Sequence, residues 1–351
     1  MTMFKMTPTE VRTNVISCIE VGLVPFITSS PGLGKSAIVK QIAKDFNLVL
    51  IDLRLSQCSP EDLMGLPMRT DDGRAKFASF QMFPIAGDKV PAGKNGWLLF
   101  LDEFNSARPA VQAAAYKLIL DKMVGQEHLH ENVFCVAAGN LATDRAIVNS
   151  MSIAMQSRLI HFEMEQSHKD FMTNAFKEKF DHRVIGFLEF QPAKLHTFKP
   201  DHADKTFACP RTWEFVSKLI EGKPGAYIST GLIAGAISDG PAVEFMTFLK
   251  EYENLPSYGQ IIAAPDQIAV PAETGTRYAL ITMMLSKFSK ESFDDAIKYV
   301  ARMPPEIQGI YLRGVVRLDP KMRRDPAYTK ASLKLTRFLS DDDEFDQQTA
   351  A

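Results

Sequence analysis

Short runs of apolar residues alternate with helical patterns over the first part of this chain. The runs are nearly continuous, which is typical of strands buried on both faces of a parallel sheet. They cover residues 23–27, 48–53, 97–101, 133–138 and 159–164. The segments between them include amphipathic runs with helical spacing of apolar positions. The pattern therefore predicts an α/β domain over residues 1–166, in which helices flank a parallel sheet on both faces.

The expected helices of this domain carry start signals. Thr7, Pro8 and Glu10 form a capping box with proline at the first helical position. Two further runs, at 37–46 and about 108–122, are also expected to be helices.

From Ser167 onward the pattern changes to helix after helix, which marks a domain boundary. We expect an all-α lid followed by a helical C-terminal extension and an acidic, disordered tail. These segments cover residues 167–255, 256–339 and 340–351.

Two stretches of the first domain depart from the alternating pattern. Residues 59–96 contain a turn at Asp71-Asp72-Gly73, and we expect a small hairpin inserted near a short helix. A surface loop with no role is an equally open reading of this insert. Residues 124–132 predict a second, shorter hairpin. His128 and His130 would share one face there, but no third ligand for a metal is evident, so a solvent-facing hairpin is favoured.

Composition and charge narrow the class of protein. The 351 residues are 46% hydrophobic and 23% charged, as in a globular domain. No run of about 18 apolar residues occurs, so we expect no membrane partner. The four cysteines include no Cys-x-x-Cys pair, which argues against a zinc ribbon or a disulfide framework and favours a cytoplasmic location.

The net charge of −2 gives no global signature of nucleic-acid binding. A local basic site in the insert remains open, because it carries Arg69, Arg74 and Lys76. Together with Phe77 and Phe80 these residues could hold single-stranded nucleic acid. Phenylalanine at alternating strand positions is more often part of a core, so this reading is the less favoured one.

The stretch Ser-Ser-Pro-Gly-Leu-Gly-Lys-Ser, from Ser29 to Ser36, lies between an expected strand and an expected helix. This is the context of a phosphate-binding loop, in which glycines let backbone N–H groups point at phosphate oxygens. Lys35 would bridge the β- and γ-phosphates of a nucleotide, and the Ser36 hydroxyl would bind Mg²⁺. The motif usually opens with glycine, and Ser29 in that position leaves the geometry of the loop open. The residues expected to bind nucleotide are Ser30, Pro31, Gly32, Leu33, Gly34, Lys35, Ser36 and Ala37.

Acidic and amide side chains follow two of the buried strands. Asp102 and Glu103 end the strand that begins at Trp97, and Asn140 follows the strand at 133–138. The carboxyl ends of parallel strands are where α/β sheets bind ligands. Asp102 would hold Mg²⁺ through water, Glu103 would polarise the water that attacks the γ-phosphate, and Asn140 would position that water. A surface acidic pair is the alternative reading.

Two arginines are further candidates. Arg158 precedes the last expected strand, where a surface salt bridge would be the ordinary role. Arg211 lies in the first turn of a helix that opens with Pro210. Because a helix dipole disfavours a cation at that end, Arg211 indicates an external anion, and the alternative is that it neutralises local acidic groups.

These motifs together resemble those of AAA+ ATPases, most closely the MoxR-like branch, which is also similar to the ATPase subunits of magnesium and cobalt chelatases. The resemblance covers about residues 8–320. The motifs that carry it are Ser-Pro-Gly-Leu-Gly-Lys-Ser, Leu-Asp-Glu-Phe-Asn, Ala-Ala-Gly-Asn, Ser-Arg and Cys-Pro-Arg-Thr-Trp, in that order.

The resemblance assigns a role to each candidate. Lys35 and Ser36 look like the Walker A pair, and Asp102 and Glu103 like the Walker B pair. The remaining three look like the first sensor, the arginine finger that reaches a neighbouring subunit's nucleotide, and the second sensor on the lid: Asn140, Arg158 and Arg211.

The resemblance also concerns the two hairpins and one departure from the usual wording. The hairpins at about 66–80 and 124–132 match an insert and a pre-sensor hairpin that face the pore or the substrate in related proteins. In this branch the usual sequence after the acidic pair is Ile-Asn-Arg, whereas Asn105 is followed here by Ser106. Arg108 comes two residues later, and its role in subunit contact is left open.

The resemblance implies an AAA+ P-loop fold, ATP and Mg²⁺ as cofactors, and a homo-oligomeric ring, most simply a hexamer. It also implies that ATP hydrolysis remodels a protein client, commonly one with a von Willebrand factor A-type domain. Two alternatives remain: a nucleic-acid-dependent motor, and a nucleotide-dependent scaffold that assembles but hardly turns over.

Overall fold

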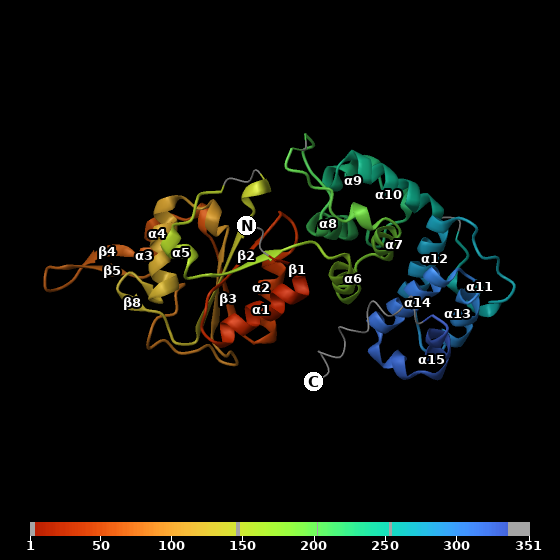
Figure 1. The fold of residues 1–351 in the computed structure, drawn as a ribbon, viewed down its shortest axis with the longest axis horizontal. Coiled ribbons are helices and arrows are strands. Elements are labelled where there is room, and N and C mark those ends of the chain that lie inside the picture. The colour runs from red at the N-terminus through yellow and green to blue at the C-terminus, as the bar shows by residue number, and fades with distance from the viewer. Residues whose placement is uncertain (1–3, 145–147, 202, 253–254, 336–351) are drawn as a thin grey trace. The chain divides into compact units, whose positions relative to one another are not determined.

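The computed structural model describes residues 4–144, 148–201, 203–252 and 255–335. Within these ranges the chain forms two compact units. The first contains residues up to Ser167 together with the short segment 199–201, and the second contains the remaining helical segments (Figure 1). The acidic tail expected at 340–351 lies outside the described residues.

The first unit is built on a six-stranded sheet in the order β1-β10-β2-β9-β6-β3. Every neighbouring pair is parallel, so all the carboxyl ends meet at one edge. The predicted α/β fold with a parallel sheet is therefore confirmed. β1 has only two residues, too few for the apolar pattern to predict it. The strands are β1 (Lys5–Met6), β2 (Pro25–Ser29), β3 (Val49–Arg54), β6 (Trp97–Asp102), β9 (Val133–Asn140) and β10 (Ile160–Met164).

Helices cover both faces of this sheet through two separate hydrophobic cores. Leu98 and Phe100 of β6 pack into the core that holds α1 (Pro8–Glu20) and α2 (Lys35–Asp45). Leu99 and Leu101 point to the other face, into the core that holds α4 (Pro109–Leu120). Because successive strand residues alternate between faces and both faces are buried, the strand reads as a continuous apolar run. The expected capping box is present at α1, where Thr7 N donates to Glu10 Oε2 at 2.7 Å.

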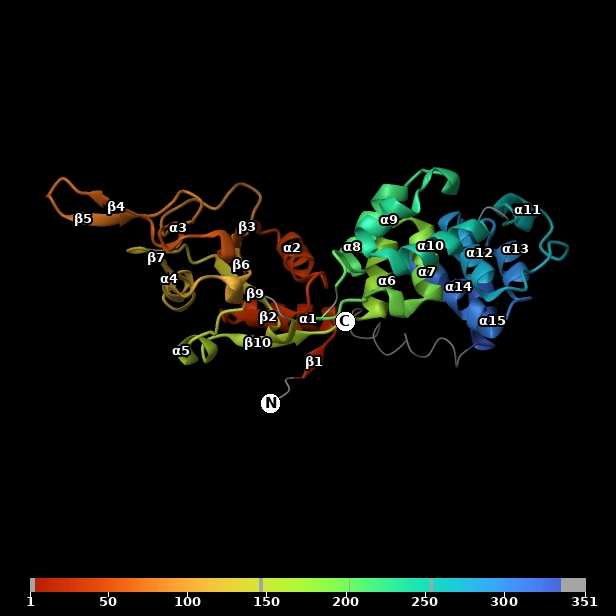
Figure 2. The ribbon, with the colours of Figure 1, turned by 90° about the horizontal axis from the view of Figure 1, so that it is seen from above.

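The insert forms an antiparallel hairpin next to a short helix. Its strands β4 (Leu66–Arg69) and β5 (Ala75–Ala78) follow α3 (Pro60–Met64). Apart from the half-buried Ala78, all their residues are exposed. Figures 1 and 2 show the hairpin as a ribbon that points away from the sheet. The structure thus contains the expected hairpin, with neither face packed on a core.

The second hairpin lies at the base of the first and is shorter than expected. It consists of β7 (Met123–Val124) and β8 (Glu127–His128). Gly125 between them has φ +58°, and a Cβ there would lie 2.5 Å from Met64 O and 3.0 Å from Phe77 Cβ. The hydroxyl of Ser79 also hydrogen-bonds the Glu127 carboxylate. The two hairpins therefore interlock at their bases.

His130 has a structural role in this region. Its Nδ1 accepts a hydrogen bond from Asn132 N at 3.0 Å, and its ring packs against Trp97 with a centroid distance of 5.1 Å. Among the residues that the structure describes, no three His, Cys, Asp or Glu side chains gather as metal ligands. Of the two histidines, His128 is exposed, as a solvent-facing hairpin predicts, whereas His130 is half-buried.

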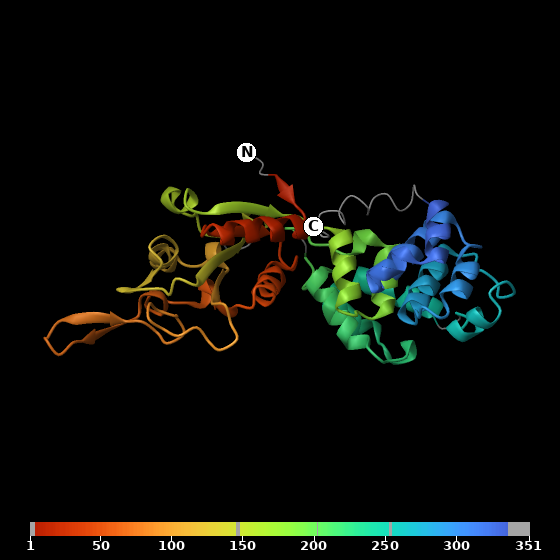
Figure 3. The same cartoon turned by 90° about the horizontal axis from the view of Figure 1, so that it is seen from below.

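The second unit is all-α, and its helices gather in one bundle (Figures 1 and 3). One continuous hydrophobic core runs through it from Phe171 to Leu335, so helices on both sides of residue 255 share it. In the described ranges, no helix is both long and apolar enough to span a bilayer. The helices are α6 (His168–Lys177), α7 (His182–Phe190), α8 (Pro210–Ile220), α9 (Thr230–Ile237), α10 (Asp239–Tyr252), α11 (Tyr258–Ala263), α12 (Thr274–Ser286), α13 (Phe293–Val300), α14 (Pro305–Leu318) and α15 (Pro326–Leu333).

Short 3₁₀ segments connect the regular elements. Those of the first unit are η1 (Leu55–Gln57), η2 (Phe104–Ser106) and η3 (Ala142–Asp144). Those of the second unit are η4 (Pro192–Lys194), η5 (Gly225–Tyr227) and η6 (Pro320–Arg324).

Candidate active site

The glycine-rich loop joins the carboxyl end of β2 to the start of α2. Gly32 and Gly34 have φ values of +80° and +96°, in the left-handed region that favours glycine. Gly34 is the N-cap of α2, and no side chain caps this helix end. Backbone N–H groups and the positive end of the dipole make such a terminus an anion site. The loop therefore fits a phosphate group.

Ser29, in the position that usually holds glycine, is the last residue of β2. It is fully buried and is not among the described residues with positive φ. Its Oγ donates to Ser30 O at 2.9 Å. The loop geometry that the sequence left open is thus compatible with serine, because glycine's freedom is used at Gly32 and Gly34 instead.

Lys35 is held at the mouth of the loop by oxygen atoms from two strands. Its Nζ donates to Ser29 O and Ser29 Oγ, both at 3.0 Å, and to Asn140 Oδ1 at 3.4 Å. Since β2 and β9 are neighbours, with Ser29 paired to Asn140, the sheet brings Lys35 and Asn140 together. The ammonium group lies where it can exchange these neutral oxygens for phosphate oxygens.

The Ser36 hydroxyl donates to Asp102 Oδ2 at 3.1 Å. Ser36 lies in the first turn of α2, and Asp102 ends β6, two strands away from β2 in the sheet. A hydroxyl and a carboxylate are the hard oxygen donors that Mg²⁺ prefers. These two residues therefore fit a magnesium site.

Glu103 directly follows β6 and has a left-handed backbone, with φ +55° and ψ +33°. Its N–H donates to Asp102 Oδ1 at 2.8 Å, and its carboxylate accepts a hydrogen bond from the Ser56 hydroxyl in η1. A non-glycine residue with this backbone is uncommon, and such strain is often found at functional sites. The Glu103 side chain thus has the Ser56 hydroxyl as a hydrogen-bond partner.

Asn105 contacts Asn140 through both of its carboxamide atoms. Its Nδ2 donates to Asn140 O at 2.7 Å, and Asn140 N donates to its Oδ1 at 3.0 Å. The residue is buried within η2, one position after Phe104. The main chain of Asn140 is thereby fixed from the side opposite Ser29.

Arg158 follows α5 (Ile153–Gln156) and is exposed. Its Nη1 donates to Ala154 O at 2.7 Å, and its guanidinium lies over the Tyr116 ring, 5.4 Å from the centroid. Among the described residues it forms no ion pair, so the ordinary salt bridge that the sequence allowed is not observed in that part of the chain. The guanidinium group is exposed to solvent.

The two other arginines named from the sequence are also exposed. Arg211 lies in the first turn of α8 in the second unit, where Thr212 and Cys209 cap the helix. Arg108 is the N-cap residue of α4. The role of Arg211 in nucleotide binding stays a prediction. A role for Arg108 in subunit contact stays open.

The glycine-rich loop with its lysine, together with the acidic pair at the end of β6, defines the class of the first unit as a P-loop ATP hydrolase. More narrowly, residues 26–159 match the family model described as an AAA domain of the dynein-related subfamily. The match contains β3, β6, β9 and nearly all of β2, together with every site residue of the first unit named above.

Comparison with curated protein sequences gives no significant match. Among solved structures, the chain is similar to NtrX of Brucella abortus in complex with ADP, with 12% identity over 96% of this chain and 70% of that one and a TM-score of 0.39. The chain is also similar to a RuvB variant of Thermotoga maritima, with 15% identity over 94% of this chain and 88% of that one and a TM-score of 0.34. Because these TM-scores are low, the class depends on the family match and on the site itself.

Three residues of the site were not named from the sequence as functional: Ser56, Asn105 and Tyr116. Asn105 lies within the Leu-Asp-Glu-Phe-Asn motif, so its position offered a signal. Ser56 and Tyr116 offered none, because a lone serine after a strand and a tyrosine in a helix are ordinary. Only the packing of η1 and α4 brings them to Glu103 and Arg158.

Proposed function

We propose that this protein is a MoxR-like AAA+ ATPase, which hydrolyses ATP with Mg²⁺ in a ring of identical subunits and uses the cycle to remodel a protein client. The observation that carries the proposal is the arrangement at the carboxyl edge of the sheet. Lys35 meets Asn140 there, Ser36 meets Asp102, and Glu103 follows directly.

The residues divide the chemistry of hydrolysis among them. Lys35 binds the terminal phosphates, and Ser36 with Asp102 would hold Mg²⁺, which neutralises charge on the phosphate oxygens when bound. Glu103 accepts the proton of the attacking water once its carboxylate leaves the Ser56 hydroxyl. Asn140, already oriented toward Lys35, positions that water.

Two substitutions test the hydrolytic site. Lys35→Ala should weaken ATP binding by at least about tenfold, because a charge-assisted contact to phosphate is lost. Glu103→Gln should keep ATP bound and lower kcat by about 10² to 10⁴, the usual contribution of a general base. Binding is measured by titration calorimetry and turnover by phosphate release. Normal turnover by Glu103→Gln would refute the assignment of the base.

The proposed ring is supported by Arg158, whose side chain is exposed. Arg158→Ala should assemble with ATP but lose about 10³-fold in kcat, as expected of an arginine that stabilises the transferring phosphoryl group. Mixing it with Lys35→Ala subunits should restore part of the activity, since each variant supplies what the other lacks. Full activity of Arg158→Ala alone would contradict a role in trans.

The client can be sought with the Glu103→Gln variant loaded with ATP. A remodeller should retain a protein from native extract in this state, and we expect a protein with a von Willebrand factor A-type domain. The retained material is analysed by mass spectrometry, with Lys35→Ala as the control that cannot bind ATP.

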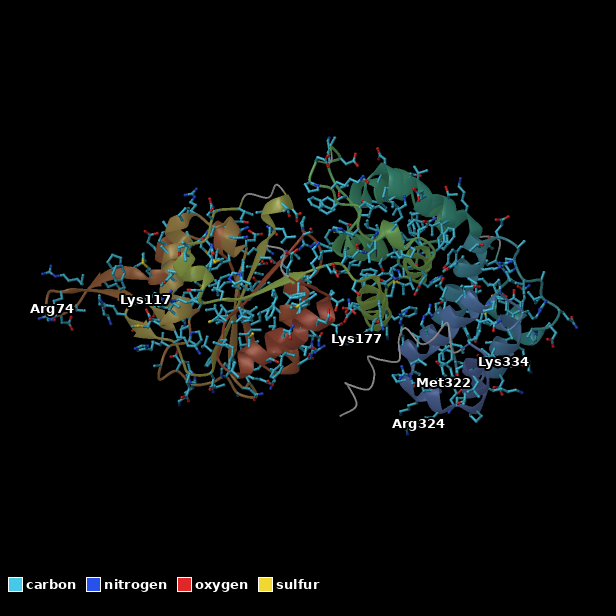
Figure 4. The ribbon with its side chains drawn as sticks, in the orientation of Figure 1. Arg74, Lys117, Lys177, Met322, Arg324 and Lys334 are labelled. Atoms are coloured by element: carbon cyan, nitrogen blue, oxygen red, sulfur yellow. The ribbon has the colours of Figure 1, made fainter. Side chains whose placement is uncertain are left out.

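A nucleic-acid motor is the second candidate, favoured by the β4–β5 hairpin. Arg69, Arg74 and Lys76 are exposed on it, and Phe77 is 39% exposed instead of buried in a core. Figure 4 shows Arg74 at the far end of the hairpin. Two results would favour this candidate. Single-stranded DNA or RNA should raise the ATPase rate, and the Glu103→Gln variant should retain nuclease-sensitive nucleic acid without a protein client.

A further inference from the structure

The feature that carries a further inference is the way β9 ends. Its pairing with β6 runs from Val133 opposite Trp97 to Ala137 opposite Leu101. Beyond this point β6 turns away into Glu103 and η2, and only β2 still pairs with the last residues of β9. Asn140 would therefore have its main chain fixed on one side only.

The side chain of Asn105 takes the place of the missing strand. Its carboxamide has the same donor and acceptor as a peptide group, and both are used on Asn140, at 2.7 and 3.0 Å. Asn105 is only 7% exposed, so water competes little for these hydrogen bonds. The backbone of Asn140 is thus held between the Asn105 carboxamide and β2.

Gly139 leaves the space that this carboxamide occupies. A Cβ on Gly139 would overlap Oδ1 and Cγ of Asn105 and would lie 2.9 Å from Phe26 Cζ. Gly139 is not among the glycines with positive φ, so its backbone conformation does not itself exclude a side chain. The absence of a side chain at this position is required by the Asn105 carboxamide and the Phe26 ring.

The main chain of Asn105 extends the link to two other parts of the site. Asn105 lies two residues after Glu103, in the 3₁₀ segment that Glu103 opens. Its carbonyl oxygen accepts the N–H of Asn149 at 2.7 Å, in the segment that leads to α5 and Arg158. One buried residue therefore joins the segments that carry Glu103, Asn140 and Arg158.

We infer that Asn105 is a positioning residue for ATP hydrolysis, which sets the Asn140 side chain relative to Glu103 by acting as a substitute strand at the end of β9. The inference depends on the proposed ATPase function for its effect on turnover, but the contact itself can be tested without nucleotide. Asn105 does not need to touch the substrate for this role.

The contact is tested by hydrogen exchange in the nucleotide-free protein. Asn105→Ala removes the acceptor of the Asn140 N–H, so exchange in peptides that contain Asn140 should become about tenfold faster or more. Peptides that cover β10 should exchange as before. Asn95→Ala is the matched control, because its carboxamide binds Phe46 O at 2.9 Å elsewhere in the first unit. Unchanged exchange at Asn140 would overturn the inference.

The catalytic effect is tested with a double-mutant cycle. Asn105→Ala should lower kcat about 10- to 100-fold, as a misplaced group does, while the ATP dissociation constant changes by less than about threefold. If Asn105 acts through Asn140, adding Asn105→Ala to Asn140→Ala should lower kcat no further. Multiplying effects, or loss of ATP affinity in step with loss of thermal stability, would show a merely structural role and overturn the inference.

Two more variants perturb the contact in different ways. Asn105→Asp keeps the acceptor and the shape but places a carboxylate oxygen against Asn140 O, so kcat should fall while folding is retained. Gly139→Ala leaves the chemistry of Asn105 unchanged and displaces its carboxamide, so it should reproduce the loss of kcat. Wild-type kcat for either variant would contradict the inference.

Failure of the proposed function gives a different result. If purified wild-type protein hydrolyses no ATP, or if Glu103→Gln hydrolyses it normally, the ATPase assignment fails. The exchange experiment then still decides whether Asn105 fixes Asn140.

Discussion

At the scale of single residues, the two charged side chains Lys35 and Glu103 form hydrogen bonds to other groups of the first unit. Lys35 is bonded to Ser29 and Asn140, and Glu103 is bonded to Ser56. A hydrogen bond to a charged group contributes about 1.5–3 kcal/mol, so these contacts must be exchanged before hydrolysis can proceed. These hydrogen bonds of Lys35 and Glu103 therefore lower the basal rate of ATP hydrolysis.

Ser56→Ala should raise the basal ATPase rate about 3- to 10-fold, because the Glu103 carboxylate is then free to accept a proton from water. The rate is measured by phosphate release without any client. Ser17→Ala serves as the control, because the Ser17 hydroxyl donates to the Thr13 carbonyl of its own helix, away from Glu103. A lower rate for Ser56→Ala would instead assign Ser56 the role of orienting Glu103.

At the scale of elements, α4 connects Arg158 to the hairpins. Tyr116 lies under the Arg158 guanidinium, and the next residue, Lys117, donates from Nζ to Gly125 O in the β7–β8 turn. Figure 4 labels Lys117 beside the base of the β4–β5 hairpin. The orientation of Arg158 and the base of both hairpins therefore depend on neighbouring residues of one helix.

Tyr116→Ala should lower the ATPase rate of the assembled protein about 2- to 5-fold, since a cation–π contact at an exposed site contributes about 0.5–1 kcal/mol. Tyr116→Phe keeps the ring and should retain the wild-type rate. The comparison is made at saturating ATP and at protein concentrations where assembly is complete. Equal loss in both variants would point to the hydroxyl instead of the ring.

The sequence predicted elements well where a long signal existed. Buried strands such as β6 and β9 were read from continuous apolar runs, and α1 from its capping box, because these signals are local. The two-residue strand β1 is too short to leave a pattern, whereas the hairpin of β7 and β8 was expected at 124–132 and has shorter strands than that range. The exposure of Phe77 was missed because alternation cannot distinguish a strand that faces a core from one that faces solvent.

The site was predictable to the same extent. Lys35, Ser36, Asp102 and Glu103 follow from motifs whose chemistry is contained in a few adjacent residues. The hydrogen bonds between Asn105 and Asn140 join residues 35 positions apart in the sequence. They depend on where β6 stops pairing with β9, which no local pattern reveals.

At the scale of the whole molecule, the two units have separate hydrophobic cores. The cores of the first unit draw on residues between Val11 and Met164, and the core of the second on residues between Phe171 and Leu335. Phe187 lies near the centre of the second core, where its ring contacts Trp213, Phe245 and Phe248. Damage to one core should therefore leave the other intact.

Phe187→Ala should destabilise the second unit by about 3–5 kcal/mol, the usual effect of removing a buried phenylalanine ring. Hydrogen exchange should accelerate throughout peptides of α7, α8 and α10, while peptides of β6 and β9 keep their protection. Uniform acceleration in both units would mean that the chain unfolds as a single cooperative body.

The close fit between Gly139 and the Asn105 carboxamide has a consequence for the history of the sequence. Because the space beside Gly139 is filled by that carboxamide and the Phe26 ring, neither position can change alone without loss. Relatives with a side chain at the position of Gly139 should therefore have a smaller residue in place of Asn105, and a carboxamide at 105 should occur only with glycine at 139. The two positions should appear as a covarying pair in any deep alignment of this lineage.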